Sequence, residues 1–161
     1  MSLRVVKVQV SLIALLCAAG ALAQAPNPYG PPVNVENAKK AAAAALAEAR
    51  KANWRMAVAV VDTGGVLVYY EKMDNTQTGS TTVAIDKAKT AAMFKRPTKA
   101  FQDALAGGGA GLRVLGLQGA TPVEGGVPII VNGQIIGGIG VSGAASDQDA
   151  VCALAGAAAV K

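Results

Sequence analysis

The segment Gly125–Gly143 reads GGVPIIVNGQIIGGIGVSG and is the part of the sequence whose residue types most clearly resemble a ligand site. The G-x-G-x-x-G spacing of a dinucleotide-binding loop occurs in it at Gly138, Gly140 and Gly143. Such a loop must connect a strand directly to a helix, and a second parallel strand must follow with an acidic residue about 20 positions on. Here the next helical pattern begins with Asp147 and Asp149, whose carboxylates would repel a pyrophosphate from that helix end. The sequence therefore predicts no nucleotide site.

Catalytic combinations of side chains are scarce. The chain has no histidine, which excludes Ser-His and Cys-His nucleophile pairs and histidine-based metal sites. Ser142 misses the nucleophile-elbow spacing and has no base to activate it. Cys152 lies among apolar residues of a predicted helix, so we expect a buried, unreactive thiol. The carboxylates form no pair that predicts acid–base chemistry, and the sequence leaves enzymatic activity undecided.

The first 23 residues have the composition of a secretory signal peptide. Arg4 and Lys7 precede the uncharged run Val8–Ala23, which ends in the small-x-small pattern that signal peptidase recognises. A membrane anchor is the alternative, but the run is shorter than the roughly 20 residues that a spanning helix needs. We therefore expect a periplasmic or secreted protein whose mature chain begins at Gln24.

Charge and composition narrow the choice of partners. The full chain has 15 basic and 10 acidic residues, and loss of Arg4 and Lys7 with the signal leaves 13 against 10, a formal charge of +3. This charge is too mild to predict binding to nucleic acid or to a membrane, and six aromatic residues offer little surface for stacking on bases. Cys152 would be the only thiol left, so no disulfide within the chain is expected.

The first half of the chain alternates between helical and extended patterns. Residues 24–33 are rich in proline and predict an extended arm. Asn34 is a suitable helix cap, and residues 35–52 are nearly all strong helix formers. The run MAVAVVDTGGVLVYYE then predicts an antiparallel hairpin, in which the two glycines supply the turn. Residues 81–94 return to a helical pattern that Pro97 ends.

The second half repeats this alternation. Thr98 is expected to cap a short helix that runs to Ala106, and residues 112–117 predict a strand or turn. VPIIV and QIIGGIGV flank Asn132-Gly133, a strong signal for a type I′ hairpin, and a final helix is expected from Ser146. The whole order predicts an α+β domain over residues 34–161, with helices packed against an antiparallel sheet. Glycines on the second arm of the late hairpin would let a helix, a second subunit or a flat ligand approach the strand closely.

Four segments, in this order along the chain, resemble the GlcG/HbpS family, whose domain also occurs at the C terminus of PduO-type corrinoid adenosyltransferases. They are VVDTGGVLVYYEKMD, AIDKAKTAAMFKRPT, VEGGVPIIVNGQIIGGIGVSG and SDQDAVCALAG. The resemblance covers residues 35–160 and implies a profilin-like α+β fold, a homo-oligomer, and binding or breakdown of haem. Residues on the helix face Ala41–Ala49 and the apolar composition also favour a homo-oligomer. At Lys72 many relatives are expected to have arginine, whose planar fork grips a carboxylate in two places.

The resemblance leads to the hypothesis of an exported haem- or tetrapyrrole-binding protein that stores, senses or breaks down haem. Met73 and Tyr70 are the expected iron contacts, and Lys72, Lys95 or Arg96 would hold the propionates. The alternatives are an accessory domain that binds a small carboxylic acid and a purely structural oligomeric protein. The metal ligand stays unknown. The predicted ligand-binding residues are Tyr70, Lys72, Met73, Arg96, Thr98, Gly125, Gly126 and Ser142.

Overall fold

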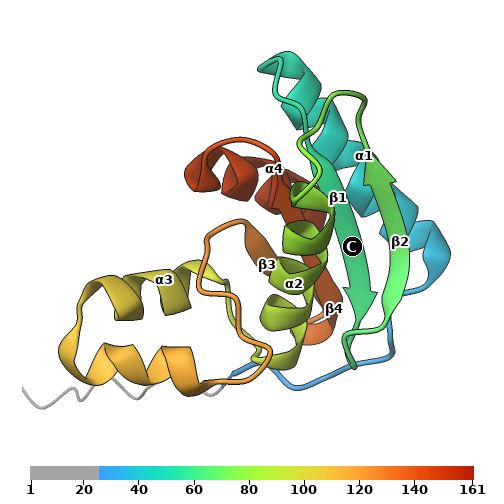
Figure 1. Ribbon diagram of the computed structural model, residues 1–161. Helices are drawn as coiled ribbons and strands as arrows, with labels where there is room; N and C mark the ends of the chain where they lie inside the picture. Colours follow the sequence, from blue (N-terminus) through green and yellow to red (C-terminus); the bar gives the residue numbers. More distant parts are fainter. Residues whose placement is uncertain (1–25) are drawn as a thin grey trace, which may run out of the picture.

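The structure, a computed structural model, describes residues 26–161, and the predicted signal segment lies outside them. Four strands form one sheet in the order β2-β1-β4-β3, with every neighbouring pair antiparallel (Figure 1). The strands are β1 (Ala57–Asp62), β2 (Leu67–Lys72), β3 (Gly126–Val131) and β4 (Gln134–Ser142). The helices are α1 (Val35–Lys51), α2 (Ser80–Met93), α3 (Lys99–Ala106), the 3-10 helix η1 (Gly109–Gly116) and α4 (Ser146–Ala158).

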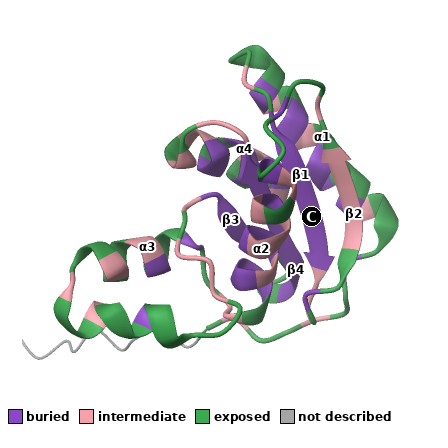
Figure 2. Cartoon of the chain, viewed as in Figure 1, coloured by how far each residue is buried: buried purple, intermediate pink, exposed green. Residues whose placement is uncertain are grey.

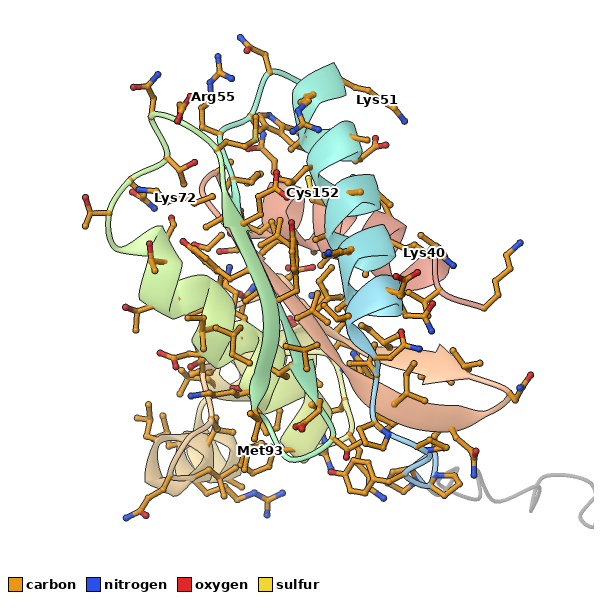
Figure 3. The ribbon with its side chains drawn as sticks, turned by 90° about the vertical axis from the view of Figure 1, so that its right-hand side faces the viewer. Lys40, Lys51, Arg55, Lys72, Met93 and Cys152 are labelled. Carbon is orange, nitrogen blue, oxygen red and sulfur yellow. The ribbon has the colours of Figure 1, made fainter. Side chains whose placement is uncertain are left out.

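The sheet lies between two layers of helices. Helix α2 covers one face, and α1 and α4 cover the other, as the view along the sheet shows (Figure 3). The two faces of β1 divide accordingly, because Ala57 and Ala59 pack toward α2 while Val58 and Val60 pack toward α1 and α4. Within residues 26–161 this arrangement confirms the predicted α+β class, an antiparallel sheet with helices packed against it.

Both predicted hairpins form, and each turn has a local cause. In the first, Asp62 Oδ1 accepts the backbone N–H groups of Gly64 and Val66 at 2.9 Å each. In the second, Asn132 and Gly133 have φ of 50° and 74°, the left-handed pair that a type I′ turn requires. The Asp62 side chain therefore stabilises the first turn.

The glycines of β4 provide room for helix α2. A Cβ added at Gly138 would lie 2.5 Å from the Ala88 carbonyl oxygen, and one added at Gly140 would collide with the Ala84 carbonyl. Gly143, at the end of the motif, faces the backbone of Arg55 in the same way. The sequence predicted that a helix, a second subunit or a flat ligand could approach these glycines. The structure shows a helix there, and α2 fills the space that a flat ligand would need on this face.

The alanine-rich face of α1 is part of the core. Asn34 caps the helix, accepting the Asn37 N–H at 2.9 Å through its side chain, and Ala41, Ala45 and Ala49 are fully buried. Helix α4 and the sheet cover these alanines, and Gly156 of α4 approaches close to the α1 backbone. The expectation that this face would pair with another subunit is therefore wrong, because the chain itself covers it.

Residues 95–119 form a protruding lobe made of α3 and η1. The lobe extends away from the sheet in Figure 1, and most of its residues are exposed in Figure 2. The predicted strand or turn at residues 112–117 is instead the second part of η1, which ends at Gly116, because this segment packs against α3 and has no strand beside it to pair with. Gly108 and Gly109 reverse the chain between the two helices with φ of 63° and 52°.

The arm is bonded to the sheet, so ordered structure begins before Asn34. Ile135 of β4 donates its N–H to Pro28 and accepts the Gly30 N–H, at 2.8 and 2.9 Å. Val33 donates to Ile136 at 2.7 Å. In the part of the chain that the structure describes, no helix is both long and apolar enough to span a membrane.

Candidate functional site

A buried ion pair lies beside the end of strand β4. Lys87 of α2 donates to Asp149 Oδ2 at 2.7 Å and to the Val141 carbonyl at 3.1 Å, and its side chain is 1% exposed. Asp149 also accepts the Ala144 N–H at 3.1 Å. Burial raises the pKa of the Asp149 carboxyl, while the Lys87 ammonium and the backbone donors oppose this rise. The pair joins α2 to α4, which lie on opposite faces of the sheet.

Three of the predicted ligand-binding residues pack around this pair. A Cβ at Gly125 would lie 2.8 Å from Lys87 Nζ, and Gly126 packs on the Lys87 backbone. Thr98 accepts the Gly126 N–H through its hydroxyl at 2.9 Å and donates its own N–H to the Gly126 carbonyl. Thr98 therefore ties the start of α3 to β3, and the expected side-chain cap on α3 is absent. All three residues are buried.

Tyr70, Lys72 and Ser142 lie on the α2 side of the sheet, where α2 begins. Lys72 and Ser142 are both paired with Ala57, one from each side, so they share a row across the sheet. Ser142 donates to the Ser80 hydroxyl at 3.1 Å and is buried, and Tyr70 donates to the Thr81 hydroxyl at 2.9 Å. Lys72 is the exposed member of this group.

The expected pairing of Met73 with Tyr70 does not form a single site. Met73 packs against the core on the α1 and α4 side, whereas Tyr70 packs on the α2 side. Strand alternation continues into the residue after β2 and sends the two side chains to opposite faces. Arg96 follows the last turn of α2, and Figure 3 shows Lys72 and Met93 at opposite ends of the sheet, so Lys72 and Arg96 are also far apart.

Other tyrosine, cysteine and methionine side chains could also bind iron, but most of them are hydrogen-bonded to other groups or buried. Tyr29 donates to the carbonyls of Ala92 and Met93, and Tyr69 donates to Glu71, which raises the pKa of Tyr69. Cys152 is fully buried, and burial raises the pKa of its thiol to about 11. Met93, at the end of α2, is 52% exposed. Within residues 26–161 no cluster of three His, Cys, Asp or Glu side chains is placed to hold a metal ion.

The lobe concentrates positive charge and exposed leucines. It has four basic residues and one acidic residue, Asp103, whereas the rest of the described chain has nine of each. The lobe therefore accounts for the whole net charge of +3 of residues 26–161. Asp103 pairs with Lys99 at 2.7 Å, both being exposed, and the Arg96 guanidinium lies 5.5 Å from the centre of the Phe101 ring. The exposed leucines are Leu112, Leu115 and Leu117.

The lobe is fixed to the body at its far end by Thr90 of α2. The Thr90 hydroxyl accepts the Thr121 N–H at 2.9 Å. At its near end, the contact between Thr98 and Gly126 holds α3. The lobe is thus bonded to the body at both ends, although only Phe101 and Val114 of its apolar residues are buried.

A separate pocket of about 300 Å³ lies between the arm, the start of α1 and the β3–β4 turn. Prolines, valines and amide side chains line it, among them Pro31, Val33, Asn37 and Asn132. It has no charged side chain to neutralise a carboxylate and contains none of the predicted ligand-binding residues. The lobe is therefore the better candidate for an acidic apolar ligand.

The sequence did not predict two features of the structure, the Lys87–Asp149 pair and the basic surface of the lobe. Asp149 was recognisable as an acid in the first turn of a helix, but its pairing with Lys87, 62 residues away, depends on the fold. Arg113 and the three exposed leucines fell in a segment that predicted a strand or turn. A signal was nevertheless present, because four of the 13 basic residues in 26–161 lie within the 25 positions 95–119.

The fold, with its buried Lys87–Asp149 pair, is a small α+β domain of one antiparallel sheet between helical layers. A family model described as "Haem degrading protein HbpS-like" matches residues 33–158, and the chain belongs to this HbpS-like family, as its resemblance to the GlcG/HbpS proteins predicts. Protein GlcG of Escherichia coli K12 is 40% identical over 100 residues, which cover 62% of this chain and 73% of GlcG.

Solved structures agree with this assignment. A doubly substituted HbpS of Streptomyces reticuli is 33% identical, has a TM-score of 0.75, and aligns over 82% of this chain and 89% of its own. The complex of PduOC with haem is 26% identical and has a TM-score of 0.72, over 81% of this chain and 96% of PduOC. The family and the fold that the sequence predicts are both confirmed.

Proposed function

We propose that this protein binds haem or another tetrapyrrole and that it does so after export. The observation that carries the proposal is family membership, since the matching family is described as haem degrading and a domain with the same fold is known as a complex with haem. The export part rests on the composition of residues 1–23.

The lobe is the surface whose chemistry fits haem best. Haem has an apolar ring and two propionate carboxylates, and the lobe offers exposed leucines beside unpaired basic side chains. Lys95, Arg96 and Arg113 of the lobe make no ion pair with another described residue, and Lys95 lies instead over the ring of Tyr29. Bound haem would supply redox-active iron, and these residues would hold and orient it.

Met93 is the methionine best placed to contact the iron. It is the exposed one among Met56, Met73 and Met93, and it directly precedes the segment that leads into the lobe. A thioether is an established axial ligand of haem iron. Met93 therefore replaces Met73 as the first methionine to test.

A haemin titration that compares charge-reversal variants tests the lobe as the binding surface. The mature protein should give a saturable Soret band, and R113E and R96E should each weaken haemin binding. Loss of an exposed ion pair of up to about 1 kcal/mol accounts for up to about five-fold, and repulsion of the propionate by the new carboxylate adds to this. Lys39→Glu, on the exposed face of α1, is the matched control and should bind like the wild type. Equal effects of all three reversals would place the haem elsewhere.

The same experiment examines the iron contact and the alternative ligand. Met93→Leu should move the Soret and charge-transfer bands if the sulfur binds iron, whereas R113E should change affinity and leave the bands in place. A small-carboxylate-binding protein remains the second candidate, because the lobe cations suit any acid. In that case succinate would bind at the lobe and haemin would show no saturable site.

We further propose that the protein is a homo-oligomer, in line with its family resemblance. Support comes from apolar side chains exposed on α4 and on the lobe, among them Val151, Leu154 and Leu115. The alanine face of α1 makes no contribution, because it is buried.

A further inference from the structure

The arm crosses the end of helix α2 and is bonded on both sides. Its backbone pairs with Ile135 and Ile136 of β4, and the Asn27 side chain donates to the Gly133 carbonyl at 3.0 Å. Gly30 fits under the side chain of Gln134. The arm therefore forms a strap, residues 27–33, between the β3–β4 hairpin and α2.

Tyr29 is the contact of the strap with α2. Its hydroxyl lies 3.0 Å from the carbonyl oxygens of both Ala92 and Met93. These carbonyls belong to the last turn of α2, which has no basic side chain of its own to satisfy them. Tyr29 supplies a donor where the helix lacks one, and this explains why the strap attaches here.

Lys95 lies over the ring of the same tyrosine. Its ammonium nitrogen is 4.0 Å from the centre of the Tyr29 ring, within the range of a cation–π contact. Lys95 has φ of 57°, a conformation that lysine seldom adopts, and it is partly buried. Tyr29 of the strap thus contacts Lys95, one of the four basic residues of the lobe. A second one, Lys99, is paired with Asp103.

We propose that the strap is autoinhibitory: docked Tyr29 keeps the Lys95 ammonium from the ligand carboxylate, and release of residues 27–33 frees it. This inference rests on the proposed binding of an acidic tetrapyrrole at the lobe. A ligand that needs Lys95 binds only the released state, so its apparent affinity is reduced by the fraction of molecules that are released.

The strength of the contact between Lys95 and Tyr29 determines how much haemin affinity should rise when the contact is removed. An exposed cation–π contact changes an equilibrium by about two- to five-fold. Tyr29→Ala should therefore tighten haemin binding by about this factor. Tyr29→Phe removes the hydroxyl but keeps the ring, so it should give a smaller gain.

A chemical readout examines the strap without any ligand. Acetylation of single lysines with acetic anhydride, followed by mass spectrometry, reports how free each ammonium is. Lys95 should react more slowly than exposed Lys39 in the wild type, and Tyr29→Ala should raise the Lys95 rate while the Lys39 rate stays constant. Unchanged Lys95 reactivity in a folded Tyr29→Ala protein would overturn the strap whether or not haemin binds.

A double-mutant cycle then links the strap to binding. Lys95→Met removes the ammonium and keeps a long side chain, so Tyr29→Ala should no longer tighten haemin binding in that background. A gain of equal size in both backgrounds, or weaker binding by Tyr29→Ala in the wild-type background, would overturn the inhibition. Absence of saturable haemin binding by the wild type would refute the proposed function instead, and would leave the acetylation result to decide the strap.

Discussion

Lys87 is the largest of the fully buried side chains, and its charge has to be compensated within the core. Asp149 and the Val141 carbonyl provide that compensation, and Gly125 leaves the room for it. Such a pair is weak evidence for net stabilisation, but loss of one partner leaves the other charge buried alone. Removal of Lys87 alone should therefore destabilise the protein.

Lys87→Met should lower the free energy of unfolding by about 3–5 kcal/mol, because Asp149 loses its counter-ion. Lys87→Met combined with Asp149→Asn should recover most of that loss, since the amide oxygen can still accept the Ala144 N–H. Urea denaturation of both variants measures this. Additive losses in the double variant would contradict the account.

The pH dependence of the Lys87→Met variant provides a second check. Burial without lysine raises the pKa of Asp149 above its unfolded value, so the folded state keeps a proton that the unfolded state releases. The variant should therefore lose stability as the pH rises from about 4 toward neutrality. Its deficit relative to the wild type should be smaller at the acidic end of this interval.

Cys152 should resist alkylation in the folded protein. Its pKa of about 11 keeps the thiol protonated near neutral pH, and the side chain is fully buried. Iodoacetamide at pH 8 should leave the Cys152 peptide unmodified until denaturant is added. Because the thiol ionises first in the unfolded state, stability should also fall above about pH 9. Rapid labelling of native protein would disprove the burial.

The sequence predicted the burial of Cys152 because its neighbours on a regular helix show which face is apolar. It could not predict the Lys87–Asp149 pair, since that contact depends on how α2 and α4 cross the sheet. Tyr70 and Met73 differ from this case. Their positions at the end of a strand were correctly inferred, and their spacing of three residues is consistent with opposite faces if the extended chain continues past Lys72, as it does.

At the scale of elements, the close packing of α2 on β4 depends on glycine. Gly140→Ala should lower the free energy of unfolding by about 1–3 kcal/mol, because the new methyl group would collide with the Ala84 backbone carbonyl. Gly116→Ala is the matched control, since nothing lies within 4 Å of its added Cβ. Thermal or urea unfolding measures both. Equal stability of the two variants would mean that α2 can move away without cost.

Elements with a strong local signal were predicted well, and the lobe was not. Asn132-Gly133 fixes its hairpin through backbone angles that few residue pairs tolerate, and the alanines of α1 favour helix in any context. Residues 112–117 have no such local signal. They become helical because α3 alone lies beside them, and the sequence gives no direct sign of that neighbour.

At the scale of the whole molecule, the proposals concern the mature chain and its assembly. The intact mass of the exported protein should equal that of a chain that begins at Gln24, because signal peptidase is expected to cut after Ala23. Light scattering of that material at micromolar concentration should give a multiple of the chain mass. A monodisperse monomer would count against the oligomer, and a retained Met1–Ala23 segment would count against export.

Saturable binding of haemin is the central claim, and a titration of the mature protein followed in the Soret region tests it most directly. The account predicts a band that rises to a plateau at a fixed ratio of haemin to chain, with weaker binding by R113E than by Lys39→Glu. A signal that grows in proportion to added haemin and never reaches a plateau would contradict it.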